Sequence, residues 1–190
     1  VPEATDNADK VLSNPDVDIV YIATPPSTHK EYVLKAAAAG KNILVEKPMG
    51  MTETESIEMA EASEAAGVQL FVAYYRRFHP HVMKMKQLIA EGKLGNLVAG
   101  IIHFRGNFPS VEESGWRVNK EISGGGHLVD NIAHRMDLFA DILGDVKSVN
   151  AKTVMDKEID VENVISISIE FTCGAIGTIT GDTLSPIRED

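Results

Sequence analysis

The stretch Ile43-Leu44-Val45-Glu46-Lys47-Pro48 is a short apolar run that stops at a carboxylate, an amine and a proline. An apolar run of this length, bounded by a residue that breaks regular structure, is typical of a strand buried on both faces of a parallel sheet. Ligands bind just beyond the carboxyl ends of the strands in such sheets. Lys47 is therefore a candidate for chemistry at a strand end. A lysine that only pairs with Glu46 or covers the sheet edge would show the same local sequence.

Apolar segments on either side of this stretch indicate the fold class. Residues 17–23 and 68–73 are also strand-like, and each is separated from residues 42–45 by a helical segment. Thr52 and Glu55 have the spacing of a capping box, which opens the second of these helices. Strand and helix alternate through this part of the chain, which predicts a parallel sheet with helical crossovers.

The pattern changes near residue 75. A helix is expected over residues 80–91, and a longer one from the glycines at 124–126 to about residue 143. Four further segments are strand-like: residues 97–104, 146–155, 161–171 and 175–183, with a turn at Cys173-Gly174. Long strands in succession predict an open, mostly antiparallel sheet. We therefore expect an α/β part in residues 1–75 and an α+β part in residues 76–190.

The composition limits the classes of function. A chain of 190 residues with 44% hydrophobic residues can bury a core, so a disordered chain is not expected. The formal net charge of -10 opposes a phosphate backbone, so we expect no nucleic-acid partner. The sequence has no apolar run of membrane-spanning length and no pattern of a signal peptide at its start. Cys173 is the sole cysteine, which excludes a cysteine-based zinc site and favours the reducing cytoplasm.

The helix expected after the triple glycine carries a row of polar side chains. Asp130, His134, Asp137 and Asp141 share one helical face by their spacing. A solvated helix face would show the same spacing. The adjacent glycines would allow a ligand to approach the backbone closely. An Asp one turn before a His also suits a general base and the carboxylate that orients it. We expect no metal at Asp130 and His134, because no further His or Cys stands at ligand spacing.

Two irregular segments are further candidates for ligand contacts. Thr24, Pro25 and His29 lie between a strand and a helix, where a hydroxyl, free amides and an imidazole could meet a nucleotide. A plain tight turn explains that segment nearly as well. Trp116 and Arg117 lie in a long irregular stretch, and the only tryptophan of the chain at such a place suggests a ligand contact.

These segments, in this order, resemble the Gfo/Idh/MocA family of NAD(P)-dependent oxidoreductases. The matching segments are residues 18–26 (DIVYIATPP) with His29, Gly40-Lys41, Glu46-Lys47-Pro48, Arg76-Arg77-Phe78-His79-Pro80, Trp116-Arg117 and residues 124–130 (GGGHLVD) with His134. The resemblance implies a Rossmann domain followed by a domain with an open, mostly antiparallel sheet. It also implies a homo-oligomer assembled through that sheet.

The resemblance further implies roles for individual residues. Lys47 would be the catalytic lysine, in a loop where the Lys47-Pro48 bond is often cis, His134 the base, and Asp130 its partner or a substrate anchor. The residues implied to line the dinucleotide are Thr24, Pro25, His29, Glu46, Lys47 and Pro48. Those implied near the nicotinamide or the substrate are Arg76, Trp116, Arg117 and Asn131.

The implied reaction is hydride transfer between NAD or NADP and a secondary hydroxyl or carbonyl group of a sugar, polyol or cyclitol. An NAD-dependent glycoside hydrolase of the same family is an alternative. A non-enzymatic sensor of a sugar or a dinucleotide is another.

The sequence departs from the family at two places. Ile132 stands where the family usually has glycine, which could narrow the site or repack the helix. The glycine-rich phosphate fingerprint of a Rossmann domain is missing. We therefore expect a fragment that lacks this N-terminal segment and the C-terminal end. On its own, such a fragment should bind NAD(P) weakly or not at all.

Overall fold

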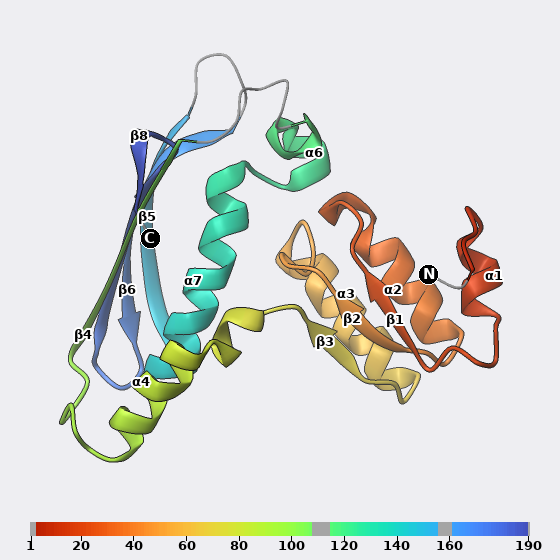
Figure 1. The fold of residues 1–190 in the computed structure, drawn as a ribbon, viewed down its shortest axis with the longest axis horizontal. Helices are drawn as coiled ribbons and strands as arrows, with labels where there is room; N and C mark the ends of the chain where they lie inside the picture. The colour runs from red at the N-terminus through yellow and green to blue at the C-terminus, as the bar shows by residue number, and fades with distance from the viewer. Residues whose placement is uncertain (1–2, 108–114, 156–160, 190) are drawn as a thin grey trace. The chain divides into compact units, whose positions relative to one another are not determined.

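Residues 3–107, 115–155 and 161–189 are described by the computed structural model, which divides into two units, Val1–Ala73 and Tyr74–Asp190. Each unit has its own sheet (Figure 1). Each also has its own hydrophobic core.

The first unit is built on a parallel sheet. Its strands, in spatial order, are β1 (Ile19–Ile22), β2 (Asn42–Val45) and β3 (Leu70–Val72). The other elements of the unit are α1 (Ala8–Leu12), the 3-10 turn η1 (Pro26–Thr28), α2 (His29–Ala38) and α3 (Glu53–Ala65). The helices α2 and α3 connect successive strands, which confirms the predicted alternation. The predicted parallel sheet is confirmed as well.

Strand β2 is the centre of this unit. Ile43 and Val45 are fully buried, because they pack with Val33 of α2 and Met59 of α3. On the other face of the sheet Tyr21 and Phe71 are more than half exposed, so the predicted burial on both faces is wrong. Helix α3 starts at Thr52, whose hydroxyl accepts a hydrogen bond from the Glu55 amide at 3.2 Å. The Glu55 carboxylate in turn accepts one from the Met51 amide at 2.9 Å. The predicted pair of Thr52 and Glu55 therefore opens this helix, although the Glu55 carboxylate bonds the amide before Thr52 and not that of Thr52 itself.

The second unit is built on an open, mixed sheet. Its strands are β4 (Ala99–Asn107), β5 (Val146–Met155), β6 (Glu162–Phe171), β7 (Ile176–Asp182) and β8 (Leu184–Glu189), in the spatial order β5-β6-β7-β4-β8. The β4–β7 pair is parallel, and the other neighbouring strands are antiparallel. The predicted fold class is thus confirmed. The sequence analysis did not anticipate β8.

One long helix covers one face of this mixed sheet. The remaining elements are η2 (Tyr75–Phe78), α4 (Pro80–Ala90), η3 (Gly115–Val118), α6 (Lys120–Ser123) and α7 (His127–Leu143). Figure 1 shows α7 running along the sheet, where its Leu128 and Phe139 join the core with Ile167 and Ile179. Gly177 makes room for this packing, because a Cβ there would lie 2.9 Å from the Phe139 ring. Among the described helices, none is long and apolar enough to cross a membrane.

The opposite face of the mixed sheet has a different character. Side chains alternate along each strand, so Ser166 and Ser168 of β6 and Thr180 of β7 point away from α7. Ile101 of β4 lies on this face with 79% of its surface exposed. The middle of the outer face therefore carries small hydroxyl side chains beside an exposed apolar group, and the charged side chains of Arg105, Glu170 and Asp182 lie on the same face.

Candidate active site

The strands of the parallel sheet lead directly into the residues that the sequence analysis singled out. The Glu46 amide donates to the Ile22 carbonyl at 2.9 Å, and the Ala73 amide donates to the Val45 carbonyl at 2.9 Å. The backbone ladder thus extends up to the residue before Lys47. Lys47 is half-buried and starts the loop at the carboxyl end of the central strand, the position at which parallel sheets bind ligands.

The Glu46 carboxylate is held within this unit. It accepts a short hydrogen bond from the Tyr21 hydroxyl, and one from the Lys47 amide at 3.2 Å. The hydrogen bond to Glu46 raises the pKa of Tyr21, because the protonated phenol is the donor. The Lys47-Pro48 peptide bond is cis, as the resemblance implied.

His29 lies beneath the loops that follow β1 and β2. Its ring is 0% exposed, with Nε2 2.8 Å from the Thr24 carbonyl oxygen and Nδ1 3.0 Å from that of Pro48. A ring in this position has no surface open to a ligand, unlike the dinucleotide contact expected from the sequence. Thr24, by contrast, is exposed and lies at a cavity of about 270 Å³ beside β1.

In the second unit, Asp130 and Asn131 lie on one turn of α7, and His134 lies on the next. Asp130 and Asn131 are half-buried, whereas His134 is 4% exposed. The Tyr75 ring packs edge-on against the His134 imidazole, with 4.8 Å between the ring centres. The sequence analysis missed Tyr75, because a contact from a 3-10 turn to a distant helix leaves no periodic signal. Imidazole is the side chain most often used in general acid–base catalysis, and this packing restricts the orientation of the His134 ring.

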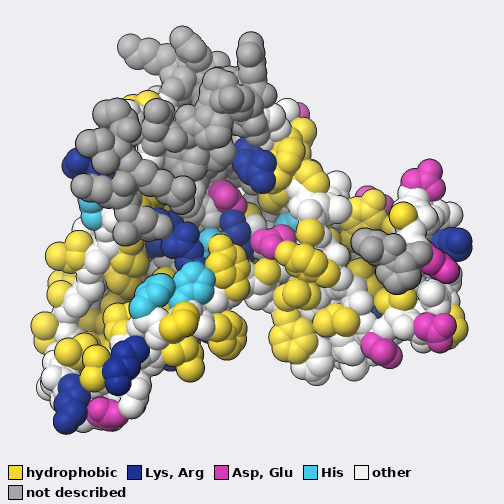
Figure 2. Space-filling view, in the orientation of Figure 1, with side chains coloured by type: hydrophobic (Ala, Val, Ile, Leu, Met, Phe, Trp, Pro, Cys, Tyr) yellow, Lys and Arg dark blue, Asp and Glu magenta, His cyan; other side chains and the backbone are white. Residues whose placement is uncertain are grey.

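The surface around η2 mixes aromatic and imidazole groups. Tyr75 and Phe78 are exposed, and the ring of His79 lies 5.6 Å from that of Tyr75 and 5.3 Å from that of His81. Figure 2 shows histidine side chains beside hydrophobic and cationic ones on the second unit. In the described part of the chain, no three His, Cys, Asp or Glu side chains form a group that could hold a metal ion.

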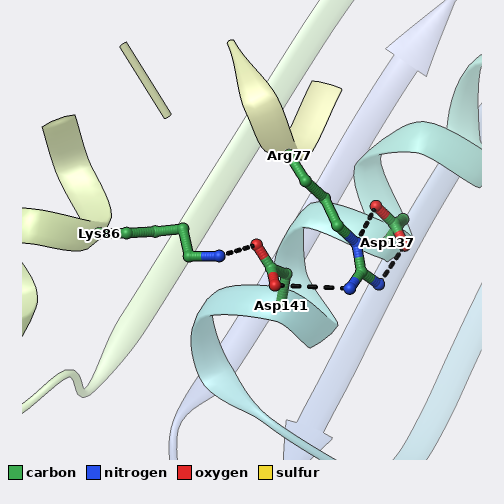
Figure 3. Close-up of polar contacts among 4 residues, drawn as sticks. All are labelled: Arg77, Lys86, Asp137 and Asp141. Carbon is green, nitrogen blue, oxygen red and sulfur yellow. Dashed lines mark hydrogen bonds and ion pairs between the residues drawn. The ribbon is translucent and has the colours of Figure 1, made fainter. Parts of the chain in front are cut away.

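The predicted polar face of α7 divides into two parts with different partners. Figure 3 shows Arg77 of η2 and Lys86 of α4 reaching two carboxylates of α7. Arg77 Nε donates to both oxygens of Asp137, at 2.9 and 2.8 Å. Lys86 Nζ lies 2.7 Å from Asp141 Oδ2. The hydrogen bond to Asp137 raises the pKa of Arg77 above its usual value. Asp137 and Asp141 therefore attach η2 and α4 to α7. This structural role differs from the two interpretations of the polar face made from the sequence, a solvated face and a catalytic face.

The start of α7 is occupied by a carboxylate of this chain. Glu162 Oε1 accepts hydrogen bonds from the amides of Gly126 at 3.0 Å and Val129 at 2.9 Å. These are amides at a helix N-terminus, which need such a partner. A Cβ on Gly126 would lie 2.8 Å from Val161, and one on Gly125 would lie 2.5 Å from Val129. The glycines expected to admit a ligand are thus required by packing and capping inside the unit.

Arg135 holds Asn131 from the core side of α7. Its Nη1 donates to the Asn131 carbonyl at 2.9 Å and lies 3.4 Å from the carboxamide oxygen. The guanidinium lies 4.0 Å from the centre of the Phe104 ring, a favourable cation–π contact. Ile132, the departure from the family, is part of the hydrophobic core, which favours the repacking interpretation over a narrowed site.

The remaining predicted site residues lie on the two 3-10 turns of the second unit. Arg76 is half-buried on η2, between Tyr75 and Arg77. Trp116 and Arg117 lie on η3, where the Arg117 guanidinium stands 4.6 Å over the indole ring. This pairing presents a flat surface with a positive charge on it.

Comparison with known proteins agrees with this architecture. Residues 1–74 match the model of an oxidoreductase family with an NAD-binding Rossmann fold, and residues 82–190 match the GFO/IDH/MocA C-terminal domain. Both matches indicate the same class of protein, the oxidoreductases that bind NAD on a Rossmann fold. The chain belongs to the Gfo/Idh/MocA family.

Its relatives include several enzymes with sugar substrates in their names. Oxidoreductase P35 of Formosa agariphila is 34% identical over 84% of this chain and 51% of the relative. The D-xylose dehydrogenase of Paenarthrobacter nicotinovorans is 35% identical over 80% of this chain and 40% of the relative. A solved levoglucosan dehydrogenase, in complex with NADH and levoglucosan, has a TM-score of 0.91 at 29% identity, over 98% of this chain and 53% of that one. The chain thus spans about half the length of the curated relatives it matches.

Proposed function

We propose that this protein is an NAD(P)-dependent oxidoreductase acting on a secondary hydroxyl or carbonyl group of a sugar, polyol or cyclitol. The observation that carries the proposal is a lysine at the end of the central strand of a Rossmann-type sheet, in the same chain as a helix that presents an Asp and a buried His on successive turns. The names of the relatives, D-xylose and levoglucosan dehydrogenases among them, support a sugar-like substrate.

The proposed roles follow from the chemistry of each side chain. His134 removes the proton of the substrate hydroxyl, and its burial against Tyr75 keeps the ring in one orientation. Asp130, one turn earlier, orients the imidazole or anchors the substrate. The Lys47 ammonium donates to the substrate oxygen or relays its proton. The cofactor, when bound, supplies the hydride acceptor.

The cofactor is proposed to lie at the carboxyl end of the parallel sheet. Residues 1–75 then form the dinucleotide-binding part, with Thr24, Pro25, Glu46, Lys47 and Pro48 along the ligand. Residues 76–190 form the substrate-binding and oligomerisation part, with Arg76, Trp116, Arg117 and Asn131 near the nicotinamide or the substrate. The half-buried or exposed state of each of these side chains supports this assignment.

We also propose that two copies associate through the outer face of the mixed sheet. The small side chains of Ser166, Ser168 and Thr180 allow two sheets to pack face to face, and a second copy would cover the exposed Ile101. An Ile101→Lys variant should sediment as a smaller species than the unchanged protein. Equal sedimentation would exclude this face as the interface.

The cytoplasm is the proposed compartment. Cys173 is exposed and unpaired, and an exposed free thiol suits a reducing environment. The net charge of -10 opposes a phosphate backbone, so we propose that nucleic acid is not a partner.

The decisive experiment replaces Lys47 in the intact protein and measures turnover on a panel of sugars and polyols. Lys47→Ala should lower kcat by about 10³-fold, since acid–base groups contribute roughly 10²–10⁴. The control is Lys35→Ala, which removes an exposed lysine of α2 paired with Glu31. Turnover equal to that of the control would remove Lys47 from the mechanism.

Product analysis on the same panel separates the alternative functions. Oxidation changes the NADH absorbance in proportion to product. Glycoside hydrolysis releases a sugar without net NADH, and a sensor binds without any product.

A further inference from the structure

The ring of His29 connects the two loops that leave β1 and β2. We propose that His29 is a positioning residue, which fixes the Lys47 loop against the Thr24 loop, and that it does not contact the dinucleotide. This inference rests on the proposed role of Lys47. It assigns to His29 a different task from that of the neighbouring residues proposed to line the ligand.

Three backbone carbonyl groups surround the ring. Nε2 lies 2.8 Å from the Thr24 oxygen, while Nδ1 lies 3.0 Å from the Pro48 oxygen and 3.2 Å from the Met49 oxygen. Thr24 follows β1, and Pro48 and Met49 follow Lys47 directly. A single side chain thus reaches both loops, and it does so at 0% exposure.

The chemistry of these three contacts limits which hydrogen bonds the His29 ring can make. Carbonyl oxygens accept hydrogen bonds and cannot donate them. Each ring nitrogen therefore faces a carbonyl oxygen, so an N–H at Nδ1 ties the ring to the Lys47 loop and an N–H at Nε2 ties it to the Thr24 loop.

The support of the ring makes it a firm anchor. His29 is the first residue of α2, and the same helix buries Val33 and Ala36 completely in the core of the unit. The preceding turn η1 adds Thr28, whose hydroxyl lies 2.9 Å from the Pro25 carbonyl oxygen and 2.8 Å from the Thr24 hydroxyl. The ring therefore cannot shift without moving a packed helix.

The Lys47 loop is held on both sides as a result. Before Lys47, the Glu46 amide bonds to the Ile22 carbonyl and the Glu46 carboxylate to the Tyr21 hydroxyl. After Lys47, His29 holds the next two carbonyl groups. A displacement of a reacting group by about 1 Å can cost about 10²-fold in rate, so a support of this kind would govern kcat.

The kinetic test compares two variants of the intact protein. His29→Phe keeps an aromatic ring and removes both ring nitrogens, whereas His29→Gln keeps a hydrogen-bonding group toward one loop. We expect kcat at saturating cofactor and substrate to fall by about 10–100-fold in His29→Phe and less in His29→Gln, with the Kd of NADH almost unchanged. The matched control is Ser63→Ala, which removes another buried hydrogen bond to backbone in the same unit. An unchanged kcat with a weakened Kd would overturn the proposal and make His29 a ligand of the cofactor.

Two structural readouts do not depend on activity. In the NMR spectrum of the unchanged protein, a ring N–H of His29 should exchange slowly with solvent, because the ring is buried and lies against backbone carbonyl groups, and a rapidly exchanging ring N–H would overturn the bridge. Amide exchange over residues 46–51 should be faster in His29→Phe than in Ser63→Ala, and equal exchange would overturn the positioning role. If the protein turned over no substrate at all, the proposed function would fail, while these two readouts would still decide the role of His29. The ring signal also decides it if His29→Phe does not fold.

Discussion

In the first unit the candidate reactive residue Lys47 lies on a loop at the end of a strand, whereas in the second unit Asp130 and His134 lie within a helix of 17 residues. The loop is held by hydrogen bonds to backbone groups, through His29 and through the amide of Glu46. The helix is held by charged side chains, with Arg77 along its side and Glu162 at its start.

The difference has a physical origin. A loop has no repeating hydrogen bonds of its own, so the position of Lys47 depends on each tertiary contact. A helix satisfies most of its own backbone, and only its orientation and its two ends need outside partners. We expect substitutions of the charged partners in the second unit to change stability. Substitutions around the loop should change turnover more than stability.

The largest expected effect on stability is at the ion pair of Figure 3. Asp137→Asn leaves Arg77 facing a neutral group in a place where the Asp137 side chain is only 4% exposed. Breaking a buried pair costs about 3–5 kcal/mol, and the partial exposure of Arg77 puts the expected loss near the lower end, at about 3 kcal/mol. Urea unfolding followed by the fluorescence of Trp116, the sole tryptophan, measures it in the second unit.

The control for that substitution is the exposed pair Lys147–Glu170, which lies on the mixed sheet of the same unit. Glu170→Gln should leave the unfolding curve almost unchanged, because water screens an exposed pair. Similar losses in the two variants would show that the pair with Asp137 is not a main support of the second unit.

A smaller effect compares the two helix starts. Glu162→Ala removes charge-assisted hydrogen bonds from buried amides of α7 and should cost about 2 kcal/mol. Thr52→Ala removes an exposed cap of α3 and should cost about 1 kcal/mol. Urea unfolding followed by circular dichroism compares the two. A larger loss of unfolding free energy in Thr52→Ala than in Glu162→Ala would contradict this order. It would mean that the local cap in the first unit contributes more than the long-range cap in the second.

The smallest effect concerns alkaline pH. Burial raises the pKa of Tyr74, and the nearby Asp137 raises it further. As the pH rises past the usual pKa of tyrosine, Tyr74 loses its phenol proton in the unfolded chain before it does so in the folded protein. The folded state therefore loses stability until the pH reaches the folded pKa of Tyr74. Tyr74→Phe should therefore show a smaller fall in Tm between about pH 9 and pH 11 than the unchanged protein. An equal fall in both would rule out a contribution from Tyr74.

Local patterns were enough for the elements that carry the candidate residues. The apolar run at 42–45 became β2 with the predicted bounds, and the spacing of Thr52 and Glu55 gave the start of α3. Periodicity also placed Asp137 and Asp141 on the same helix as His134. It could not assign their partners, because Arg77 and Lys86 come from segments more than fifty residues away along the chain. The role of Glu162 was missed for the same reason, since it reaches the start of α7 from 36 residues away along the chain.

By itself, the sequence determined the alternation of strands and helices, the strand end at Lys47 and the helical spacing of Asp130 and His134. These follow from interactions between residues close together in the chain, which hydrophobic periodicity and capping record directly. Only the tertiary structure decided that His29 bridges two loops, that Glu162 occupies the start of α7 and that the glycines serve packing. Those outcomes depend on which distant backbone groups are left needing a partner once the core has formed, and no local pattern contains that information.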